Sequence, residues 1–173
     1  MQTCIILGSA RSDGHTAIVA ARLAELIGAE VIDLNQYQIG FFDYDQAHES
    51  DDFLPLIRRI SQSYDHIILA SPVYWYTMSA QLKTFLDRFS DLLKWHKDLG
   101  RDFRGKSLGF LSCMGSDGPP QSLDEPIRLS AEYLGMDYLG HVHAWLDGQI
   151  VSPEADLALR QFADEWNTRK PHL

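Results

Sequence analysis

A short stretch near the N-terminus combines hydroxyl, imidazole and guanidinium groups in the pattern of an anion-binding loop. Gly8 and Gly14 allow the backbone to turn sharply and to approach a ligand closely. Arg11 adds a fixed positive charge, and its neighbours add hydroxyl or ring N–H donors. The candidate donors to an anion are Ser9, Arg11, Ser12, His15 and Thr16. This donor set is suited to a phosphate group.

The residues on either side of this loop predict a strand before it and a helix after it. Residues 4–7 form an apolar run typical of a strand buried on both faces. From Thr16 onward, apolar residues recur at helical spacing. A strand, a small polar loop and a helix in this order direct free N–H groups and the positive end of the helix dipole at the anion. The alternative is an ordinary strand-to-helix turn, with Thr16 or Asp13 as the helix N-cap.

The loop differs from two well-known phosphate motifs. It lacks the Gly-Lys-Ser/Thr ending of a nucleoside-triphosphate P-loop, and it lacks the three-glycine dinucleotide fingerprint. Hydroxyl groups and one arginine fit a monophosphate better than a triphosphate with magnesium. We therefore expect a mononucleotide.

A second segment, residues 71–78, follows a predicted buried strand and is rich in aromatic residues. Pro72 fixes its own φ and favours extended backbone in the residue before it. The segment is therefore predicted to be a raised loop that forms the rim of a binding site. Tyr74, Trp75 and Tyr76 offer flat faces for a planar ring, although such aromatics also serve as core or interface residues. With a phosphate loop nearby, they favour a flat cofactor with a phosphate tail, such as flavin mononucleotide (FMN).

Size and composition predict one domain that spans residues 1–173. A hydrophobic content of 45% is that of an ordinary globular protein, and the formal net charge of −9 argues against nucleic acid or an anionic membrane as partner. Cys4 and Cys113 are too few and too far apart for a disulfide framework or a metal cluster. The first strand starts almost at the initiator methionine, and no apolar run reaches transmembrane length. We expect a cytoplasmic protein.

The order of elements predicts an α/β fold. Strands are expected at 4–7, 30–34, 66–70, 106–112 and 136–145. Because helical patterns separate them, a flavodoxin-like parallel sheet with strand order 2-1-3-4-5 and helices on both faces is predicted. In such sheets, ligands bind beyond the carboxyl ends of the strands. The loops after the first, third and fourth strands then meet at one crevice.

Three other segments complete this prediction. Residues 35–50 form a long connection, of a length that is often functional. One long amphipathic helix is expected after Met78, with Asp87 and Arg88 as solvated charges on it. Residues 94–104 are expected to be irregular.

Residues 8–16 and 71–88 together resemble the NADPH-dependent FMN reductase family, in particular the branch that includes the iron–sulfur flavoproteins. The resemblance implies that the five loop residues named above surround the FMN phosphate. It places four residues beside the isoalloxazine ring: Pro72, Val73, Tyr74 and Trp75. It matches three more to a third flavin loop by position: Met114, Gly115 and Ser116. Residues 35–50 contain no cysteine, so the iron–sulfur cluster of some relatives is expected to be absent.

The resemblance also implies hydride transfer from NADPH or NADH through FMN to a small-molecule electron acceptor: a quinone, an azo or nitro compound, a metal ion or free flavin. Relatives of this kind are commonly homodimers or homotetramers, and residues 41–44 and the segment around Trp95 are candidate partner surfaces. No acid–base pair, nucleophile or metal site is predicted; His141 and His143 share a strand face but lack a third ligand. Two alternatives stay open: a flavodoxin-type electron carrier, and a flavin-free binding protein with the same fold.

Overall fold

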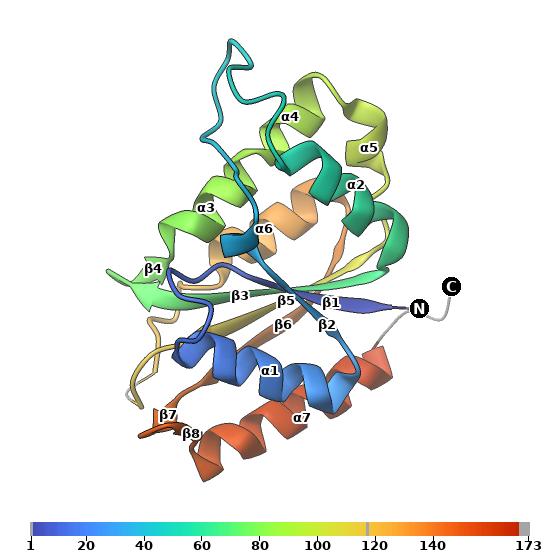
Figure 1. Cartoon of the computed structure of the whole chain (residues 1–173). Coiled ribbons are helices and arrows are strands. Elements are labelled where there is room, and N and C mark those ends of the chain that lie inside the picture. Colours follow the sequence, from blue (N-terminus) through green and yellow to red (C-terminus); the bar gives the residue numbers. More distant parts are fainter. Residues whose placement is uncertain (1, 117, 170–173) are drawn as a thin grey trace.

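The computed structural model describes residues 2–116 and 118–169, and its centre is a parallel sheet (Figure 1). The long strands lie in the order β2-β1-β3-β5-β6, which is the order predicted for five strands and that of flavodoxin-like folds. The short strand β4 pairs antiparallel with β3, and β7 and β8 form a separate ribbon; these three were not predicted. The strand bounds are β1 (Thr3–Leu7), β2 (Glu30–Asp33), β3 (His66–Tyr74), β4 (Thr77–Met78), β5 (Ser107–Cys113), β6 (Asp137–Ala144), β7 (Leu146–Asp147) and β8 (Ile150–Val151).

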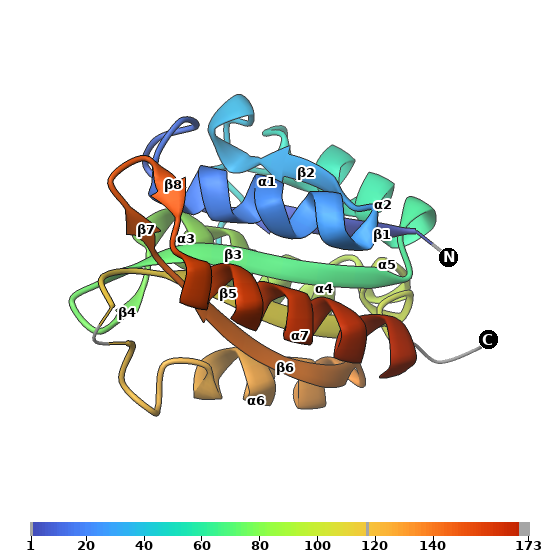
Figure 2. The ribbon, with the colours of Figure 1, turned by 90° about the horizontal axis from the view of Figure 1, so that it is seen from below.

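Helices cover both faces of the sheet, as predicted. Figures 1 and 2 show α1 and α7 side by side on one face and the remaining helices on the other. The 3-10 helix η1 (Leu34–Gln36) follows β2. The helix bounds are α1 (His15–Ile27), α2 (Phe53–Ser63), α3 (Ala80–Asp87), α4 (Phe89–Lys94), α5 (Lys97–Arg101), α6 (Glu125–Leu134) and α7 (Pro153–Arg169).

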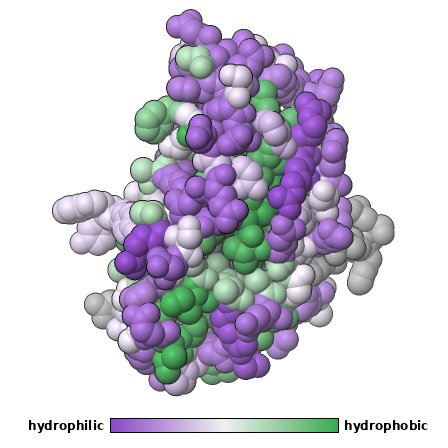
Figure 3. Space-filling view, in the orientation of Figure 1, coloured by the Kyte–Doolittle hydropathy of each residue, from purple (hydrophilic) through white to green (hydrophobic). Residues whose placement is uncertain are grey.

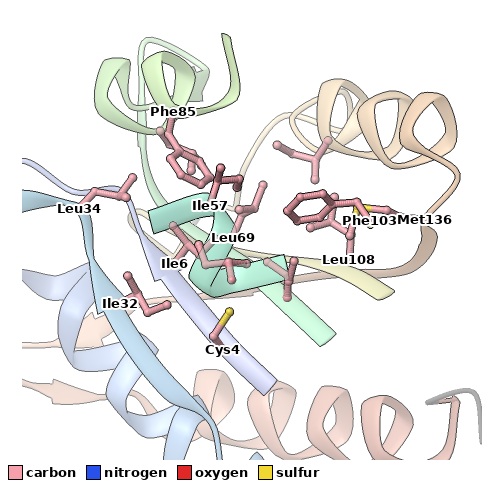
Figure 4. Close-up of a cluster of buried hydrophobic side chains, with 14 of the residues drawn as sticks. Cys4, Ile6, Ile32, Leu34, Ile57, Leu69, Phe85, Phe103, Leu108 and Met136 are labelled. Atoms are coloured by element: carbon pink, nitrogen blue, oxygen red, sulfur yellow. The ribbon is translucent and has the colours of Figure 1, made fainter. Parts of the chain in front are cut away.

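Each face of the sheet has its own hydrophobic core, because successive side chains of a strand point to opposite faces. Ile5 of β1 packs in one cluster with residues of α1 and α7. Ile6, the next residue, packs in the other cluster with residues of α2, α3 and α6. Figure 4 shows this second core, where Ile6 and Leu69 of adjacent strands lie close to Ile57 of α2. A sheet buried on both faces accounts for the continuous apolar runs in the sequence.

The segment at 71–78 is part of a strand and a hairpin, so the expectation of an irregular loop is wrong. β3 continues to Tyr74, and its last two residues pair with β4. Pro72 is tolerated in this strand because pairing between β3 and β1 ends at Ala70. Its missing N–H therefore removes no hydrogen bond between these two strands. On the other side Pro72 lies opposite Cys113 of β5.

The expected long helix after Met78 is divided in two, and the region expected to be irregular holds α5. α3 ends at Asp87 and α4 begins at Phe89. At the junction the Asp91 N–H donates to the Arg88 carbonyl at 2.9 Å, a three-residue step that tightens the turn. Phe103, beyond α5, is fully buried. The turn between α3 and α4 also carries a charged side chain that is buried.

That side chain is Arg88, which is buried and not solvated as predicted. Only 2% of its surface is exposed, and its guanidinium forms ion pairs with Asp51 and with Asp91. It also donates to the carbonyls of Gly40 (3.1 Å) and His48 (3.3 Å). Burial alone would raise the pKa of Asp51, but hydrogen bonds, first that from Arg88, outweigh burial and lower it. Arg88 thus attaches the long connection between η1 and α2 to the helical layer.

The outer surface reflects the acidic composition. Figure 3 shows hydrophilic residues over most of one face, with narrow apolar strips between them. None of the helices in the described ranges is long and apolar enough to cross a lipid bilayer.

Replacing Arg88 with methionine is expected to lower the free energy of unfolding by about 3 kcal/mol, because two largely buried carboxylates lose their counter-ion. Urea denaturation followed by circular dichroism measures this change. Arg101, which pairs with Asp98 at the surface, is the matched control. Arg101→Met should change the unfolding free energy by less than about 1 kcal/mol. Equal effects of the two substitutions would contradict the role given to Arg88.

Candidate functional site

An open cavity of about 420 Å³ lies at the carboxyl ends of β1, β3 and β5. In Figure 1 this end of the sheet is on the left, near β4 and the β7–β8 ribbon. Its volume is in the range of ligand pockets. The wall is made by Ser9, Arg11, Gly14, His15, Thr16, Pro72, Val73, Tyr74, Cys113, Met114, Gly115 and Leu146. Nine of the twelve candidate residues from the sequence are among them; Ser12, Trp75 and Ser116 are not.

The loop after β1 is held in place by bonds at its first residue. The Gly8 N–H donates to the Ala70 carbonyl of β3 (2.8 Å), and the Ser79 hydroxyl donates to the Gly8 carbonyl (2.6 Å). A Cβ atom at Gly8 would stand 2.6 Å from the Cβ of Leu82, so a side chain here would collide with α3. Gly8 is therefore needed for close packing of α3 against the loop.

The first turn of α1 has no capping side chain. Its N-cap is Gly14, and no side chain bonds to the amides that follow. The alternative of Thr16 or Asp13 as N-cap is thus wrong, and Asp13 is exposed. The first turn has no acidic residue either. The unpaired N–H groups and the positive end of the helix dipole therefore remain for a ligand anion.

The predicted phosphate-binding residues divide into two layers. Ser9 and Thr16 are buried at the base of the cavity, and Arg11 and His15 are exposed at its edge. The Arg11 guanidinium lies over Gly14, with Nε 3.5 Å from the position that a Cβ there would take. Hydroxyl groups below and a positive charge above are arranged as an anion requires.

Ser12 and a residue that sequence reasoning missed support this loop from outside the cavity. The side-chain amide of Asn35 donates to the Ser9 carbonyl (2.8 Å) and to the Ser12 hydroxyl (3.3 Å). Gln81 of α3 in turn donates to the Asn35 side chain (3.0 Å). The sequence carries no signal for this contact, because it depends on where the chain goes after β2.

The β3–β4 hairpin forms the aromatic side of the cavity. Pro72, Val73 and Tyr74 line it, whereas Trp75 at the tip is 93% exposed. Trp75 and Tyr76 have φ angles of 49° and 64°, which are values that a two-residue hairpin turn imposes and that asparagine and glycine adopt more readily. The turn thus carries two large, exposed aromatic side chains at the tip of the hairpin, next in the chain to Tyr74 of the cavity wall.

The third predicted loop contributes Met114 and Gly115 to the wall, and Ser116 lies beyond it. Cys113 and Leu146 also line the cavity. Leu146 was missed because the β7–β8 ribbon that carries it was not predicted. Burial raises the pKa of Cys113 to about 11, so at neutral pH this residue is a thiol and not a thiolate.

Next to this third loop, His141 and His143 both contact the hydroxyl group of Ser112. His141 Nε2 lies 2.7 Å and His143 Nδ1 lies 3.0 Å from Ser112 Oγ. Burial lowers the pKa of His141 to about 4 and also lowers the pKa of His143. Among the described residues, no group of three histidine, cysteine, aspartate or glutamate side chains is arranged to hold a metal ion.

Several known proteins are similar to this chain in sequence and in fold. The profile of the NADPH-dependent FMN reductase family matches residues 1–149. A putative NAD(P)H-dependent FMN-containing oxidoreductase of Bacillus subtilis (strain 168), YwqN, is 30% identical over 154 residues, which are 82% of this chain and 83% of that protein. The chain belongs to the NADPH-dependent FMN reductase family.

Two further similarities agree with membership in the FMN reductase family. An NADPH azoreductase of Bacillus sp. (strain OY1-2) is 26% identical over 97 residues, or 56% of this chain and 54% of that protein. The structure of the Trp repressor binding protein from Bacillus subtilis superposes with a TM-score of 0.70 at 24% identity, over 93% of this chain and 97% of that one, which shows a shared fold. The resemblance to this family that the sequence indicated is confirmed, and the placement in the branch of the iron–sulfur flavoproteins stays a prediction. The chain is accordingly an oxidoreductase of the FMN-dependent class.

The cavity fits the cofactor of the FMN reductase family. An uncapped helix start, buried hydroxyl groups and one arginine suit a phosphate monoester. The opposite part of the wall, from Pro72 to Tyr74 and at Met114 and Leu146, is apolar and aromatic and suits a flat ring.

The His141 pKa predicts how stability depends on pH. The folded state binds the proton less readily than the unfolded state, whose histidine pKa is about 6.5. Stabilisation is therefore complete above about pH 6.5 and is lost as the pH falls toward 4. We expect His141 to account for about 3 kcal/mol of this loss. Urea denaturation between pH 7 and pH 4 should show a flatter profile for His141→Gln than for the wild type, and parallel profiles would refute the assignment.

Proposed function

We propose that this chain binds FMN in the cavity at the carboxyl end of its sheet and catalyses reduction of a small aromatic acceptor by NADPH or NADH. The proposal depends mainly on one observation. The first turn of α1 has backbone amides that no side chain caps, and this turn lines the same cavity as the aromatic hairpin.

The phosphate end of the site is assigned to four residues. Ser9 and Thr16 would donate hydroxyl hydrogen bonds, His15 a ring N–H and Arg11 a charge-assisted bond. In a chain with a net charge of −9, an anionic ligand needs such a local positive site. Ser12 takes part through its bond with Asn35, which holds the loop in position.

The ring end is assigned to the remaining wall residues. Val73, Tyr74 and Met114 would hold the isoalloxazine ring and exclude water from one side of it. Bound FMN supplies hydride transfer chemistry, and the protein supplies orientation, electrostatics and access. Burial disfavours the thiolate form of Cys113 in the wall, which argues against a nucleophilic role for this residue.

The rim supports a flat, conjugated acceptor. Tyr74 lines the cavity, and Trp75 and Tyr76 expose their rings at the tip of the same hairpin. Aromatic faces favour stacking with planar molecules. A quinone or an azo compound is such a molecule, and one relative is named an NADPH azoreductase.

We further propose that the protein is a homo-oligomer. The two candidate surfaces from the sequence form one patch: the Phe42 ring lies 5.1 Å from Tyr44 and 6.1 Å from Trp95, centroid to centroid. Lys94 lies over the Tyr44 ring at 4.3 Å. Phe41 and Tyr44 are each 73% exposed. Exposed aromatic side chains gathered in this way are typical of protein–protein contacts.

FMN binding and reduction test the proposed function. The purified protein incubated with FMN should become yellow, and NADPH added without oxygen should bleach it until a quinone restores the colour. Arg11→Ala should raise the FMN dissociation constant about tenfold, because one charge-assisted bond to phosphate is lost. Flavin fluorescence quenching measures this constant.

Riboflavin and a second arginine serve as controls. Riboflavin lacks the phosphate, so its affinity should be the same for wild type and Arg11→Ala. Arg58 is exposed on α2, away from the cavity wall, and Arg58→Ala should leave both affinities unchanged. A protein that stays colourless with FMN would instead support the flavin-free binding protein.

Self-association is tested by light scattering coupled to size-exclusion chromatography. The wild type should elute with the mass of a dimer or tetramer at micromolar concentration. Phe41→Ser with Tyr44→Ser should shift the mass toward 19.6 kDa, the mass of one chain. As a control, Tyr133→Ser changes an exposed aromatic residue on α6, outside this patch, and should leave the mass unchanged. A monomeric wild type would exclude the proposal.

A further inference from the structure

Four groups behind the third cavity loop form a continuous chain of hydrogen bonds. Ser112 Oγ lies between the two histidines, 2.7 Å from His141 Nε2 and 3.0 Å from His143 Nδ1. The other ring nitrogen of His143, Nε2, lies 3.1 Å from the Gly115 carbonyl oxygen. The chain thus runs from the interior of β6 to a residue of the cavity wall.

The contact with Gly115 gives the protons of this chain one direction. A carbonyl oxygen can only accept, so the 3.1 Å contact is a hydrogen bond only when His143 Nε2 carries the hydrogen. In the neutral ring, His143 Nδ1 is then an acceptor and takes the Ser112 hydroxyl hydrogen. Ser112 Oγ in turn accepts from Nε2–H of His141. Each member donates one bond toward the loop, and the tautomer of both rings is fixed.

The surroundings keep this chain neutral and rigid. Ser112 is fully buried and lies opposite His143 in the β5–β6 register. The His141 ring stacks on Phe110 at 5.0 Å, and the His143 ring stacks on Trp145 at 5.8 Å, centroid to centroid. The groups that act on the charge of His141 are Asp124, which favours the charged form, and His143, which opposes it. Burial outweighs both and disfavours a charged ring.

The loop that this chain reaches has few other restraints. Gly115 has open space around the position of a Cβ atom, and its carbonyl accepts one further, longer bond from the Gly118 N–H (3.4 Å). Because a trans peptide group is planar, a fixed Gly115 carbonyl also fixes the direction of the next N–H group. The bond from His143 therefore sets the orientation of one peptide group in the cavity wall.

We propose that His143 is a positioning residue of the FMN site. It holds the Gly115 peptide through Nε2, with its tautomer set by Ser112 and His141. The inference rests on the proposed function of the cavity, and it assigns a task to a histidine pair that does not line the cavity.

Two substitutions of His143 separate the bonds that it makes. Glutamine places an amide group near the Nε2 position and can still donate to Gly115. Asparagine places its amide near the Nδ1 position and can bond only to Ser112. His143→Asn should raise the FMN dissociation constant about tenfold, as expected for one lost hydrogen bond. His143→Gln should raise it less than about threefold. Equal losses for both variants would show that His143 only packs, and would overturn the inference.

Nitrogen NMR of the flavin-free protein gives an independent readout. His143 should show a protonated Nε2 and an unprotonated Nδ1 at pH 7, and Ser112→Ala should shift the Nδ1 resonance, because this nitrogen then loses its hydrogen-bond donor. A protonated Nδ1 in the wild type would refute the inference whether or not FMN binds. Failure of the wild type to bind FMN, with the tautomer as stated, would refute the proposed function alone.

Discussion

The unpaired amides at the start of α1 are the constraint on which the rest of the site depends. A helix that begins at a glycine, without a capping side chain, leaves N–H groups that need an acceptor. The tight turn at Gly8, the bonds from Ser79 and Asn35, and the close approach of α3 all hold the loop open in this form. The interior is thus arranged to keep these donors available to a ligand, and an anion is the ligand that satisfies them.

Local patterns in the sequence predicted most of the fold because both faces of the sheet are buried. Apolar runs as in β1 and recurring helical apolar positions as in α1 identify their elements without tertiary information. Arg88 could not be assigned in this way. Its spacing on a helix looks like that of a solvated residue, and its partner Asp51 lies 37 residues earlier in the chain. Likewise, the length of β3 depends on pairing with β4, which only the folded chain reveals.

The sequence predicted the site residues that lie in one continuous segment. It did not predict the contacts between segments that are distant in the chain. Ser9, Arg11 and Thr16 stand in one loop whose glycines and hydroxyl groups are visible in the sequence. Leu146 reaches the cavity only through a ribbon that turns back after β6. The hydrogen bonds of Ser112 with two histidines depend on the β5–β6 register. This register shifts at residues 108 and 109, and no sequence pattern predicts the shift.

Cys113 has a consequence for the durability of the protein. It lies in the cavity wall, and burial raises its pKa to about 11. Reduced flavins generate hydrogen peroxide when they meet oxygen, and peroxide attacks thiolates far faster than thiols. A buried cysteine that keeps its proton is therefore sulfenylated more slowly than a thiolate would be. Burial of Cys113 thus slows the oxidation of this part of the cavity wall.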